Sequence, residues 1–285
     1  MNEDAKPGSL YLCATPIGNL EDVTLRALRI MREVSLIAAE DTRHTRKLLS
    51  RYDIHTPLTS YHEHNKREKG PKLVAQLKEG KDIALVSDAG TPGISDPGQE
   101  LVLLAVEEGL TVIPVPGASA VIAALTSSGL STGRFAFEGF LPRVRKERNK
   151  VLNQIVAEER SFVFYESPQR IMKTLQEILA FAGDRNIVVA RELTKVHEEI
   201  LRGQISQIIE HFRGHSPKGE FTVVLDGRND KTKELPIRSS SDLYKMVTGY
   251  LVQGFDKKGA IKETARTIGI SKKEVYSAVL EVENK

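Results

Sequence analysis

The sequence predicts an α/β protein with a mainly parallel sheet, followed by a small all-α module. Short apolar runs alternate with helical stretches through the first 228 residues, which is the order of βαβ units. Most of these runs are rich in Val, Ile, Leu and Ala without regular polar alternation, as strands buried on both faces are. A polar stretch at 227–241 then precedes a last helical segment, which indicates a separate module.

The predicted strands and helices alternate in chain order. The strands are expected at 10–14, 34–39, 83–87, 111–115, 134–140, 161–165, 186–190 and 220–225. The helices are expected at 21–33, 43–51, 66–79, 98–108, 119–128, 146–158, 169–181 and 204–213. Asp96-Pro97 and Ser167-Pro168 each place an N-cap residue before a proline, which is typical of a helix start. Helix ends are expected at the glycines that follow helical runs, Gly80, Gly109 and Gly129.

Two boundaries divide the chain into three parts. The segment 114–118, which contains two prolines and a glycine, closes the first βα block, and the stretch 227–241 is polar enough to be a linker. We therefore predict an N-terminal α/β lobe at 1–116 and a second α/β lobe at 117–228. A linker and a C-terminal module are predicted at 229–285.

The C-terminal module is expected to consist of three helices within 242–285. The stretch 260–271 has the small-residue and Gly-turn rhythm of a helix-turn-helix, and Ser271 with Glu274 would form a capping box for the last helix. Lys272 and Lys273 place positive charge at a helix N-terminus, which suits phosphate contacts. A packing or dimerisation module is the alternative interpretation.

The composition is that of a globular protein outside the membrane. No apolar run approaches the roughly 18 residues that a membrane span needs, and the N-terminus lacks the apolar core of a signal peptide. We therefore expect a cytoplasmic protein. The single cysteine, Cys13, stands in an apolar strand and is expected to be a core residue rather than a nucleophile.

Positive charge is concentrated in two segments, although the net charge of +3 is too small to indicate a nucleic-acid partner by itself. Residues 40–72 hold eight Lys or Arg against five acids, and residues 143–150 hold five against a single Glu. Such segments attract phosphates, but a solvated helix face explains each one equally well. His62 and His64 have a spacing that could ligate a metal, yet no companion Cys or carboxylate motif supports it, so no metal site is predicted.

Three loops rich in glycine and proline follow predicted strands. The loop 87–98 has three glycines and two prolines in twelve residues, and the loops 114–120 and 15–19 are similar in kind. Glycine lets the backbone approach a ligand, proline stiffens the turn, and α/β folds bind ligands at the carboxyl ends of their strands. The glycine spacing fits neither a dinucleotide fingerprint nor a P-loop. We therefore expect the three loops to converge on one crevice, with tight chain connections as the alternative.

Six segments resemble the type I small-subunit ribosomal RNA methyltransferases, a family of the tetrapyrrole methylase superfamily. They are 14–22, 39–43, 87–98, 115–120, 164–170 and 191–195. The resemblance implies a two-lobed, class III methyltransferase fold, a homodimer, and a cofactor, S-adenosylmethionine, in the cleft between the lobes. It also implies 2′-O-methylation of the ribose of cytidine 1402, in the decoding centre of 16S rRNA. Because decoding-centre nucleotides take shape late, we expect the assembled 30S subunit to be the substrate.

The resemblance also assigns residues to the cofactor. Contacts with its methionine part are implied for Asp88, Ala89, Gly90, Ile94, Ser119 and Ala120. Pro16 would lie near the methyl acceptor. From the second lobe, Tyr165, Ala190 and Phe221 would close over the adenine, largely through backbone atoms.

Methyl transfer to a ribose hydroxyl needs the oxygen in line with the S–CH₃ bond. A group that removes the hydroxyl proton, or stabilises the developing oxyanion, would help. Charged residues at predicted strand ends are the candidates, namely Asp41, Arg43, Glu166 and Lys195. Asp41 would accept a proton and Arg43 would hold a phosphate. Structural roles stay open for both regions. Asp41 and Thr42 could instead cap the helix 43–51, and a local ion pair would explain Arg191, Glu192 and Lys195 equally well.

Two other functions remain open. The same cofactor could serve a tetrapyrrole or a modified protein side chain, and an anionic macrocycle would also bind cationic residues. A DNA-binding regulator that senses a small molecule in its α/β body is the alternative from another class. Catalytic turnover would exclude regulation as its sole role.

Overall fold

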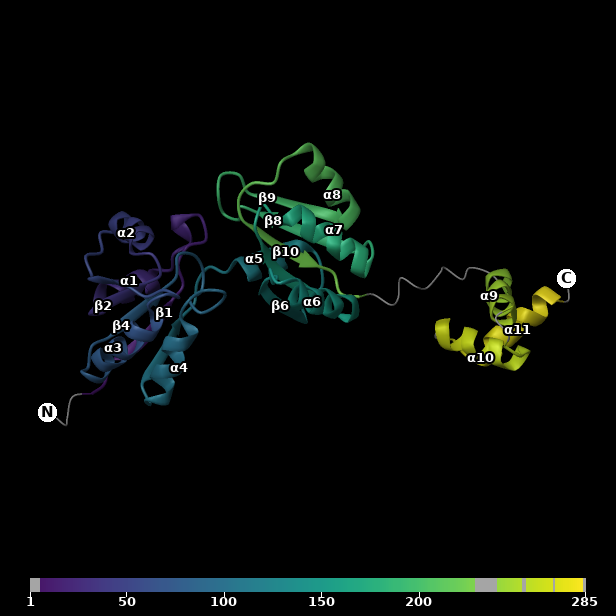
Figure 1. Ribbon diagram of the computed structural model, residues 1–285, viewed down its shortest axis with the longest axis horizontal. Coiled ribbons are helices and arrows are strands. Elements are labelled where there is room, and N and C mark those ends of the chain that lie inside the picture. Colours follow the sequence, from purple (N-terminus) through teal and green to yellow (C-terminus); the bar gives the residue numbers. More distant parts are fainter. Residues whose placement is uncertain (1–5, 229–239, 253–254, 269, 284–285) are drawn as a thin grey trace. The chain divides into compact units, whose positions relative to one another are not determined.

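A computed structural model describes residues 6–228, 240–252, 255–268 and 270–283 (Figure 1). The chain divides into two compact units, Met1–Gly227 and Arg228–Lys285. The first unit contains two five-stranded sheets, each at the centre of one lobe. Residues 229–239, which make up most of the predicted linker, lie outside the described residues. The boundaries 1–116, 117–228 and 229–285 stay predictions.

The first lobe is built on a parallel sheet with the strand order β3-β2-β4-β1-β5. The strands are β1 (Ser9–Cys13), β2 (Leu36–Ala39), β3 (Leu58–Ser60), β4 (Ile83–Val86) and β5 (Thr111–Val115). All four positions of β4 are buried, which explains its apolar run without alternation. Because all five strands run in the same direction, the loops that follow them emerge at one edge of the sheet.

Helices cover both faces of this sheet. They are the 3₁₀ helix η1 (Leu20–Asp22) and the α-helices α1 (Leu25–Glu33), α2 (Thr42–Arg51), α3 (Lys66–Lys78) and α4 (Gln99–Glu107). One hydrophobic cluster packs α1 and α2 on one face, through Met31 and Leu48 among others. A second cluster packs α3 and α4 on the other face, through Leu77 and Leu101.

The second lobe has a mixed sheet with the order β6-β7-β10-β8-β9. Its strands are β6 (Phe135–Phe140), β7 (Ser161–Glu166), β8 (Asn186–Arg191), β9 (Glu199–Gln204) and β10 (Phe221–Leu225). Only the β6–β7 pair is parallel, whereas β10 runs antiparallel to β7 and β8, and β9 antiparallel to β8. The predicted mainly parallel sheet is therefore correct for the first lobe and wrong for the second. The connection 192–198 is too short for the helical crossover that a parallel β8–β9 pair would need.

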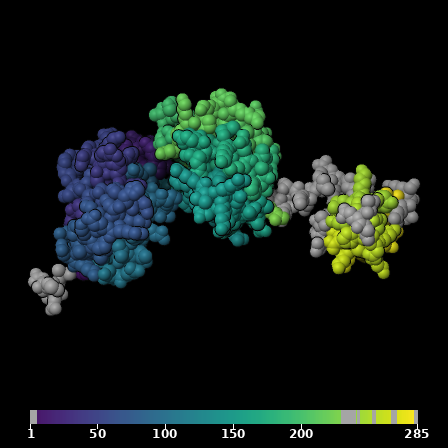
Figure 2. All heavy atoms as spheres, in the orientation of Figure 1, coloured from purple at the N-terminus to yellow at the C-terminus, as the bar shows by residue number. Residues whose placement is uncertain are grey.

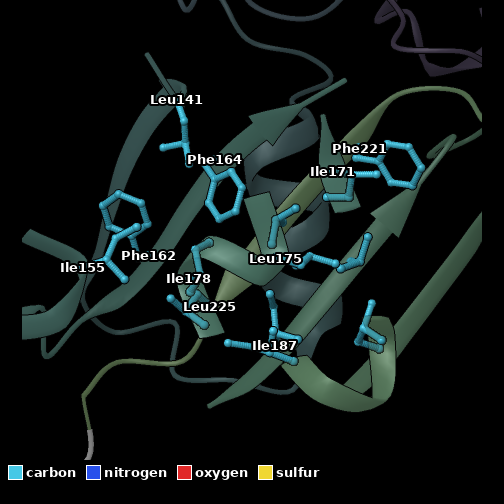
Figure 3. Packing of buried hydrophobic residues seen from close by; sticks show 14 of the residues in the cluster. Leu141, Ile155, Phe162, Phe164, Ile171, Leu175, Ile178, Ile187, Phe221 and Leu225 are labelled. Carbon is cyan, nitrogen blue, oxygen red and sulfur yellow. The ribbon is translucent and has the colours of Figure 1, made fainter. Parts of the chain in front are cut away.

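Helices also cover both faces of the second sheet. They are α5 (Ala120–Ser128), α6 (Arg145–Ala157), α7 (Ile171–Ala182) and α8 (Ile205–Gly214). The helix α5 packs on one face, and α6, α7 and α8 pack on the other around the largest hydrophobic cluster. Figure 3 shows side chains of that cluster, including Phe164, Leu175 and Ile187, packed against one another. Figure 2 shows the atoms of the described units as closely packed spheres.

The structure corrects several predicted helix starts. The helix expected at 21–33 is interrupted, because Thr24 is extended and its side chain caps α1 by accepting the N–H of Ala27. The expected caps Asp96 and Ser167 precede loops, since α4 begins after Gly98 and α7 after Arg170. The helix ends are better predicted: Gly80, Gly109 and Gly129 all adopt the left-handed conformation.

The second unit contains α9 (Ser240–Val252), α10 (Lys257–Ile268) and α11 (Lys272–Glu283), so the predicted three helices are confirmed. They share a small core with members such as Val247, Ala260 and Val275. The capping box is also confirmed: Ser271 N–H donates to Glu274 Oε2 at 2.8 Å, and Glu274 N–H donates to Ser271 Oγ at 3.2 Å. Among the described residues of both units, no helix has the length and apolar character needed to cross a membrane.

Candidate functional site

A pocket of about 430 Å³ lies where strand ends of both lobes meet, which is a volume typical of small-molecule sites. The first lobe contributes Ile17, Glu40, Asp88, Ala89, Gly90, Thr91, Ile94, Ser95 and Asp96. The second lobe contributes Ser119, Ala120, Phe140, Tyr165, Glu166, Ser167, Pro168, Ala190, Leu193, Gly219, Glu220, Phe221 and Thr222. Nearly all of these residues stand at a strand end or in the adjoining loop. The predicted convergence of three loops on one crevice is therefore confirmed.

The loop 87–98 forms one wall, and its backbone is held in place. Gly90 has a φ of +80°, in the left-handed region that favours glycine. Its N–H donates to the carbonyl of Thr15 at 3.0 Å, and its carbonyl accepts the N–H of Thr15 at 2.9 Å. The hydroxyl of Thr15 also donates to the carbonyl of Ser87 at 3.1 Å. The loops after β1 and β4 are thus tied together beneath the pocket.

Aromatic side chains from β6 and β7 form the opposite wall. The ring centroid of Tyr165 lies 5.1 Å from that of Phe137 and 5.4 Å from that of Phe140. Burial, followed by the charge of Asp96, raises the pKa of Tyr165 to about 12, so its hydroxyl stays protonated at neutral pH. Phe140 differs from the other two rings because 54% of its surface is exposed.

Two contacts join the lobes beside the pocket. On one side, the N–H of Asn19 donates to Thr194 Oγ1 at 3.0 Å, and a Cβ added to Gly18 would lie 2.7 Å from the same oxygen. On another side, a Cβ added to Gly139 would lie 3.0 Å from Ser95 Oγ. A side chain at Gly18 would displace the 192–198 loop, and one at Gly139 would press against the Ser95 hydroxyl.

Backbone strain accompanies these contacts. Ser95, Glu192 and Thr194 have φ values of 61°, 50° and 66°, although none is glycine. Left-handed conformations of such residues are uncommon and are concentrated at ligand sites and moving segments. All three residues line the pocket or belong to the 192–198 loop beside it.

The pocket is acidic. Five carboxyl groups line it and no Lys or Arg does, within the part of the chain that is described: Glu40, Asp88, Asp96, Glu166 and Glu220. Arg170 Nε lies 3.3 Å from Glu166, and Lys195 Nζ lies 2.9 Å from Glu220. The other three carboxyl groups form no ion pair with any described residue. A cation is therefore the ligand that this pocket favours electrostatically.

Burial and mutual repulsion raise the pKa of two of these groups. Burial first, and then the charge of Glu40, raise the pKa of Asp96 to about 7, against a hydrogen bond from Ser87 that lowers it. Burial and the charge of Asp88 also raise the pKa of Glu40. A positive ligand beside them would favour their ionised forms.

The predicted cofactor contacts coincide closely with the pocket lining. The lining includes Asp88, Ala89, Gly90, Ile94, Ser119, Ala120, Tyr165, Ala190 and Phe221. The remaining residue, Pro16, is buried and does not line the pocket, whereas its neighbour Ile17 does. The location is thus as expected, and the role of each residue in binding stays a prediction.

Of the predicted catalytic residues, Glu166 alone lines the pocket. Its carboxylate accepts the hydroxyl of Thr174 at 2.7 Å and the N–H of Ser167 at 2.9 Å, and it is paired with Arg170. With 2% of its surface exposed, Glu166 is built into the wall. These contacts show a structural role, and a catalytic role stays a prediction.

Asp41, Arg43 and Lys195 lie outside the lining. Asp41 caps α2 by accepting the N–H of Arg43 at 2.8 Å, and its carboxylate lies 2.7 Å from the Arg43 guanidinium. Hydrogen bonds from Arg43 hold the pKa of Asp41 well below its usual range, so Asp41 is a poor proton acceptor. Lys195 lies 2.9 Å from both Glu192 and Glu220. The cap and the local ion pair are therefore confirmed.

Glu40, Asp96 and Phe140 are among the pocket residues that the sequence prediction missed. Glu40 directly follows β2, and Phe140 ends β6, so their positions at strand ends were available as a signal. Asp96 was expected to cap a helix, because its proline neighbour is typical of a helix start. The burial that raises its pKa depends on the folded pocket and leaves no local mark in the sequence.

Cys13 lies in the core, as predicted. Its side chain is fully buried, and burial raises its pKa to about 12. The thiolate, which is the nucleophilic form, is absent at neutral pH.

Residues 9–209 match the family model of the tetrapyrrole (corrin/porphyrin) methylases. Relatives named ribosomal RNA small subunit methyltransferase I occur in several bacteria. The protein of Halalkalibacterium halodurans is 48% identical over 271 residues, covering 95% of this chain and 94% of the relative. That of Bacillus subtilis is 45% identical over 279 residues, covering 97% and 96%. A relative in Thermotoga maritima is 50% identical over 221 residues, which are 78% of this chain but 99% of the relative.

Solved structures with this fold are more distant in sequence. A cobalt precorrin-4 methyltransferase is 18% identical with a TM-score of 0.58, covering 76% of this chain and 94% of its own. A diphthine synthase is 15% identical with a TM-score of 0.59, covering 77% and 90%. At these identities the two similarities show the shared fold alone.

Proposed function

The chain belongs to the tetrapyrrole (corrin/porphyrin) methylase family, among the relatives named ribosomal RNA small subunit methyltransferase I, and from that premise we propose its donor, acceptor and site. It is a methyltransferase. The donor is S-adenosylmethionine, held in the pocket between the lobes. The acceptor is the 2′-hydroxyl of cytidine 1402 in 16S rRNA, within the 30S subunit. The enzyme acts in the cytoplasm as a homodimer.

The pocket fits this donor in size and charge. S-adenosylmethionine carries a sulfonium and an ammonium group, and Glu40, Asp88 and Asp96 are carboxyl groups without an ion-pair partner among the described residues. The pocket volume of about 430 Å³ suits one ligand of this size. This acidic lining is the observation that carries the proposal, because it would repel an anionic donor or an anionic macrocycle.

The residues around the pocket divide into two groups in this proposal. The loop 87–98, with Ser119 and Ala120, binds the amino acid part through backbone groups and the carboxylate of Asp88. The second lobe holds the adenine between Tyr165 and the backbone at Ala190 and Phe221. The backbone pairing of Gly90 with Thr15 fixes these positions before any ligand binds, so little ordering is needed on binding.

Bound S-adenosylmethionine supplies a methyl group that its positive sulfur already activates, so the protein has mainly to orient the acceptor oxygen and manage its proton. Asp96 is the strongest candidate to accept that proton. It lines the pocket, and its pKa of about 7 is close to the ideal for a general base at neutral pH. A cation in the pocket favours its ionised, proton-accepting form.

Methyl transfer tests this proposal directly. Tritiated S-adenosylmethionine is incubated with the enzyme and 30S subunits from cells that lack the gene, and the modified ribose is mapped by mass spectrometry. We expect one 2′-O-methyl group on the decoding-centre cytidine, and loss of incorporation in Asp88→Ala and in Gly90→Trp. If the enzyme bound S-adenosylmethionine but methylated no form of rRNA, the proposed acceptor would be wrong and the proposed donor would still hold. Equal methylation of protein-free 16S rRNA would refute the 30S requirement.

A further inference from the structure

The pocket and the chain segment beside Phe140 carry charge of opposite sign. The pocket lining holds five carboxyl groups, whereas the segment 143–150 holds Arg143, Arg145, Lys146 and Lys150 on its exposed surface. None of these four cations has an ion-pair or hydrogen-bond partner among the described residues. A polyanionic chain is thus repelled from the pocket and attracted to the adjoining segment.

Phe140 stands at the junction between the two. It lines the pocket, yet 54% of its surface is exposed, and its ring contacts the buried ring of Tyr165. Arg143 follows only three residues later, so its Cα lies within about 11 Å of that of Phe140. An exposed aromatic ring beside unpaired cations is the arrangement with which proteins hold single-stranded nucleic acid.

The start of the basic segment is fixed to the pocket wall. Arg170, which is paired with the wall residue Glu166, donates to the carbonyl of Leu141 at 2.6 Å. The buried Arg148 donates to the carbonyl of Pro142 at 3.3 Å and is held by Glu177 at 2.6 Å. The one buried arginine of the segment therefore serves the fold, and the exposed cations project from a rigid base.

We infer that Phe140 stacks on the base of the acceptor nucleotide while the exposed cations of 143–150 bind the flanking phosphates. This inference rests on the proposed RNA methyl transfer and adds the surface that recognises the RNA. The acidic pocket keeps the phosphates outside, so only the ribose of an unstacked nucleotide reaches the methyl donor. Proteins read unstacked bases of RNA by stacking them on aromatic side chains in this way.

Steady-state kinetics on unmethylated 30S subunits test the stacking. In Phe140→Ala we expect kcat/KM for 30S to fall by about 5- to 100-fold, the range for loss of one base–aromatic stack. The dissociation constant of S-adenosylmethionine should change by less than twofold. Phe140→Tyr should restore activity, and Phe140→Leu, which keeps apolar bulk without an aromatic face, should not.

The chain offers a matched control. Phe181 is also exposed, at 42%, but belongs to α7 and does not line the pocket, so Phe181→Ala should leave kcat/KM unchanged. A weakened S-adenosylmethionine affinity in Phe140→Ala with normal use of 30S would assign the ring to the donor instead. Normal donor binding and normal kinetics in Phe140→Ala would also overturn the inference. Absence of rRNA methylation by the parent enzyme would instead refute the proposed function.

Salt dependence tests the cations independently. Arg143→Ala/Arg145→Ala should weaken 30S binding and reduce the slope of log affinity against log salt concentration by about 1 to 2, as expected for two lost phosphate contacts. The control is Lys78→Ala/Lys81→Ala, which removes two exposed cations near the start of β4, at the sheet edge opposite the pocket. An equal change of slope in both double variants would refute a phosphate site at 143–150.

Discussion

Asp96 is the pocket residue whose protonation changes nearest neutral pH. Its carboxyl group interacts with three other titratable groups. These are Glu40, which follows β2, Asp88, which belongs to the same loop, and Tyr165, which belongs to β7. A buried carboxyl group with acidic neighbours stabilises the fold in its neutral form and destabilises it when ionised. The same side chain therefore affects both chemistry and stability.

Removing the proton acceptor should slow the chemical step. We expect Asp96→Asn to lower kcat by about 10²- to 10⁴-fold, the usual contribution of a general base. Between pH 6 and pH 8, the remaining rate should lose the pH dependence that the parent enzyme shows. Measurement of kcat against pH on 30S subunits, with donor binding as the control, decides the point. A variant with normal kcat would exclude Asp96 as the base.

The same substitution should stabilise the unliganded protein at higher pH. The pKa of Asp96 is raised from an ordinary 3.8 to about 7, so its contribution to stability is full below pH 4 and is lost as the pH rises through 7. Asp96→Asn lacks this penalty. We expect its melting temperature to exceed that of the parent by about 2–4 °C at pH 8, as ~1 kcal/mol gives, and to match it near pH 4. Equal melting temperatures at both pH values would contradict the raised pKa.

At the scale of elements, the two lobes are joined through loops rather than through packed helices. The loop 15–19 contacts the loop 192–198, and β6 approaches Ser95 closely at Gly139, where its pairing with β7 is irregular. Positive φ values at Ser95, Glu192 and Thr194 show that these loops hold strained conformations. The width of the pocket therefore depends on a few short-range loop contacts.

Gly18→Ala should widen the pocket without unfolding either lobe. Its Cβ would lie 2.9 Å from the carbonyl oxygen of Leu193 and 2.7 Å from Thr194 Oγ1, so the 192–198 loop must move. We expect donor affinity to fall by about tenfold, with little change in circular dichroism. The control is Gly133→Ala, whose Cβ would meet nothing within 4 Å. Unchanged donor affinity in Gly18→Ala would show that this contact does not shape the site.

The sequence predicts the buried elements well and the exposed ones poorly. Strands such as β4 have an apolar run because both of their faces are covered, and such runs are visible without a structure. The short strand β3 and the strand β9, which has charged residues and a glycine, were missed. Both lie at sheet edges, where half-exposed positions remove the apolar run.

The site shows the same division. The loops that converge on the pocket could be predicted, because glycine, proline and strand order are local features of the sequence. The raised pKa of Asp96 and the partial exposure of the Phe140 ring could not be predicted. Both depend on how far residues of the other lobe bury these side chains. Asp41 and Lys195 each form an ion pair with a neighbouring charge, and their catalytic roles stay predictions.

At the scale of the whole molecule, all residues of the pocket belong to the first unit. The second unit has its own small hydrophobic core, so each unit buries its apolar side chains within itself. Among the described residues, none of the second unit lines the pocket.

A chain ending at residue 227 should therefore fold and bind the methyl donor. We expect its donor dissociation constant to lie within about twofold of that of the full chain, because no pocket residue is removed. Its affinity for 30S subunits should fall if the lysines of α11 bind phosphates, and stay unchanged if the unit serves only packing. Calorimetry of donor binding and sedimentation with 30S subunits measure both. If the fragment were insoluble, or soluble but unable to bind the donor, the first unit would not fold and bind the donor without the second.

Because Cys13 is buried, the folded chain should not react with thiol reagents. The chain has no other cysteine, and a thiol with a pKa of about 12 does not react with maleimides near neutral pH. Val196, in the loop that contacts the first lobe, is 97% exposed. Val196→Cys would therefore accept a fluorescent dye at one position only, and its emission would report any change around the 192–198 loop when a ligand enters the pocket.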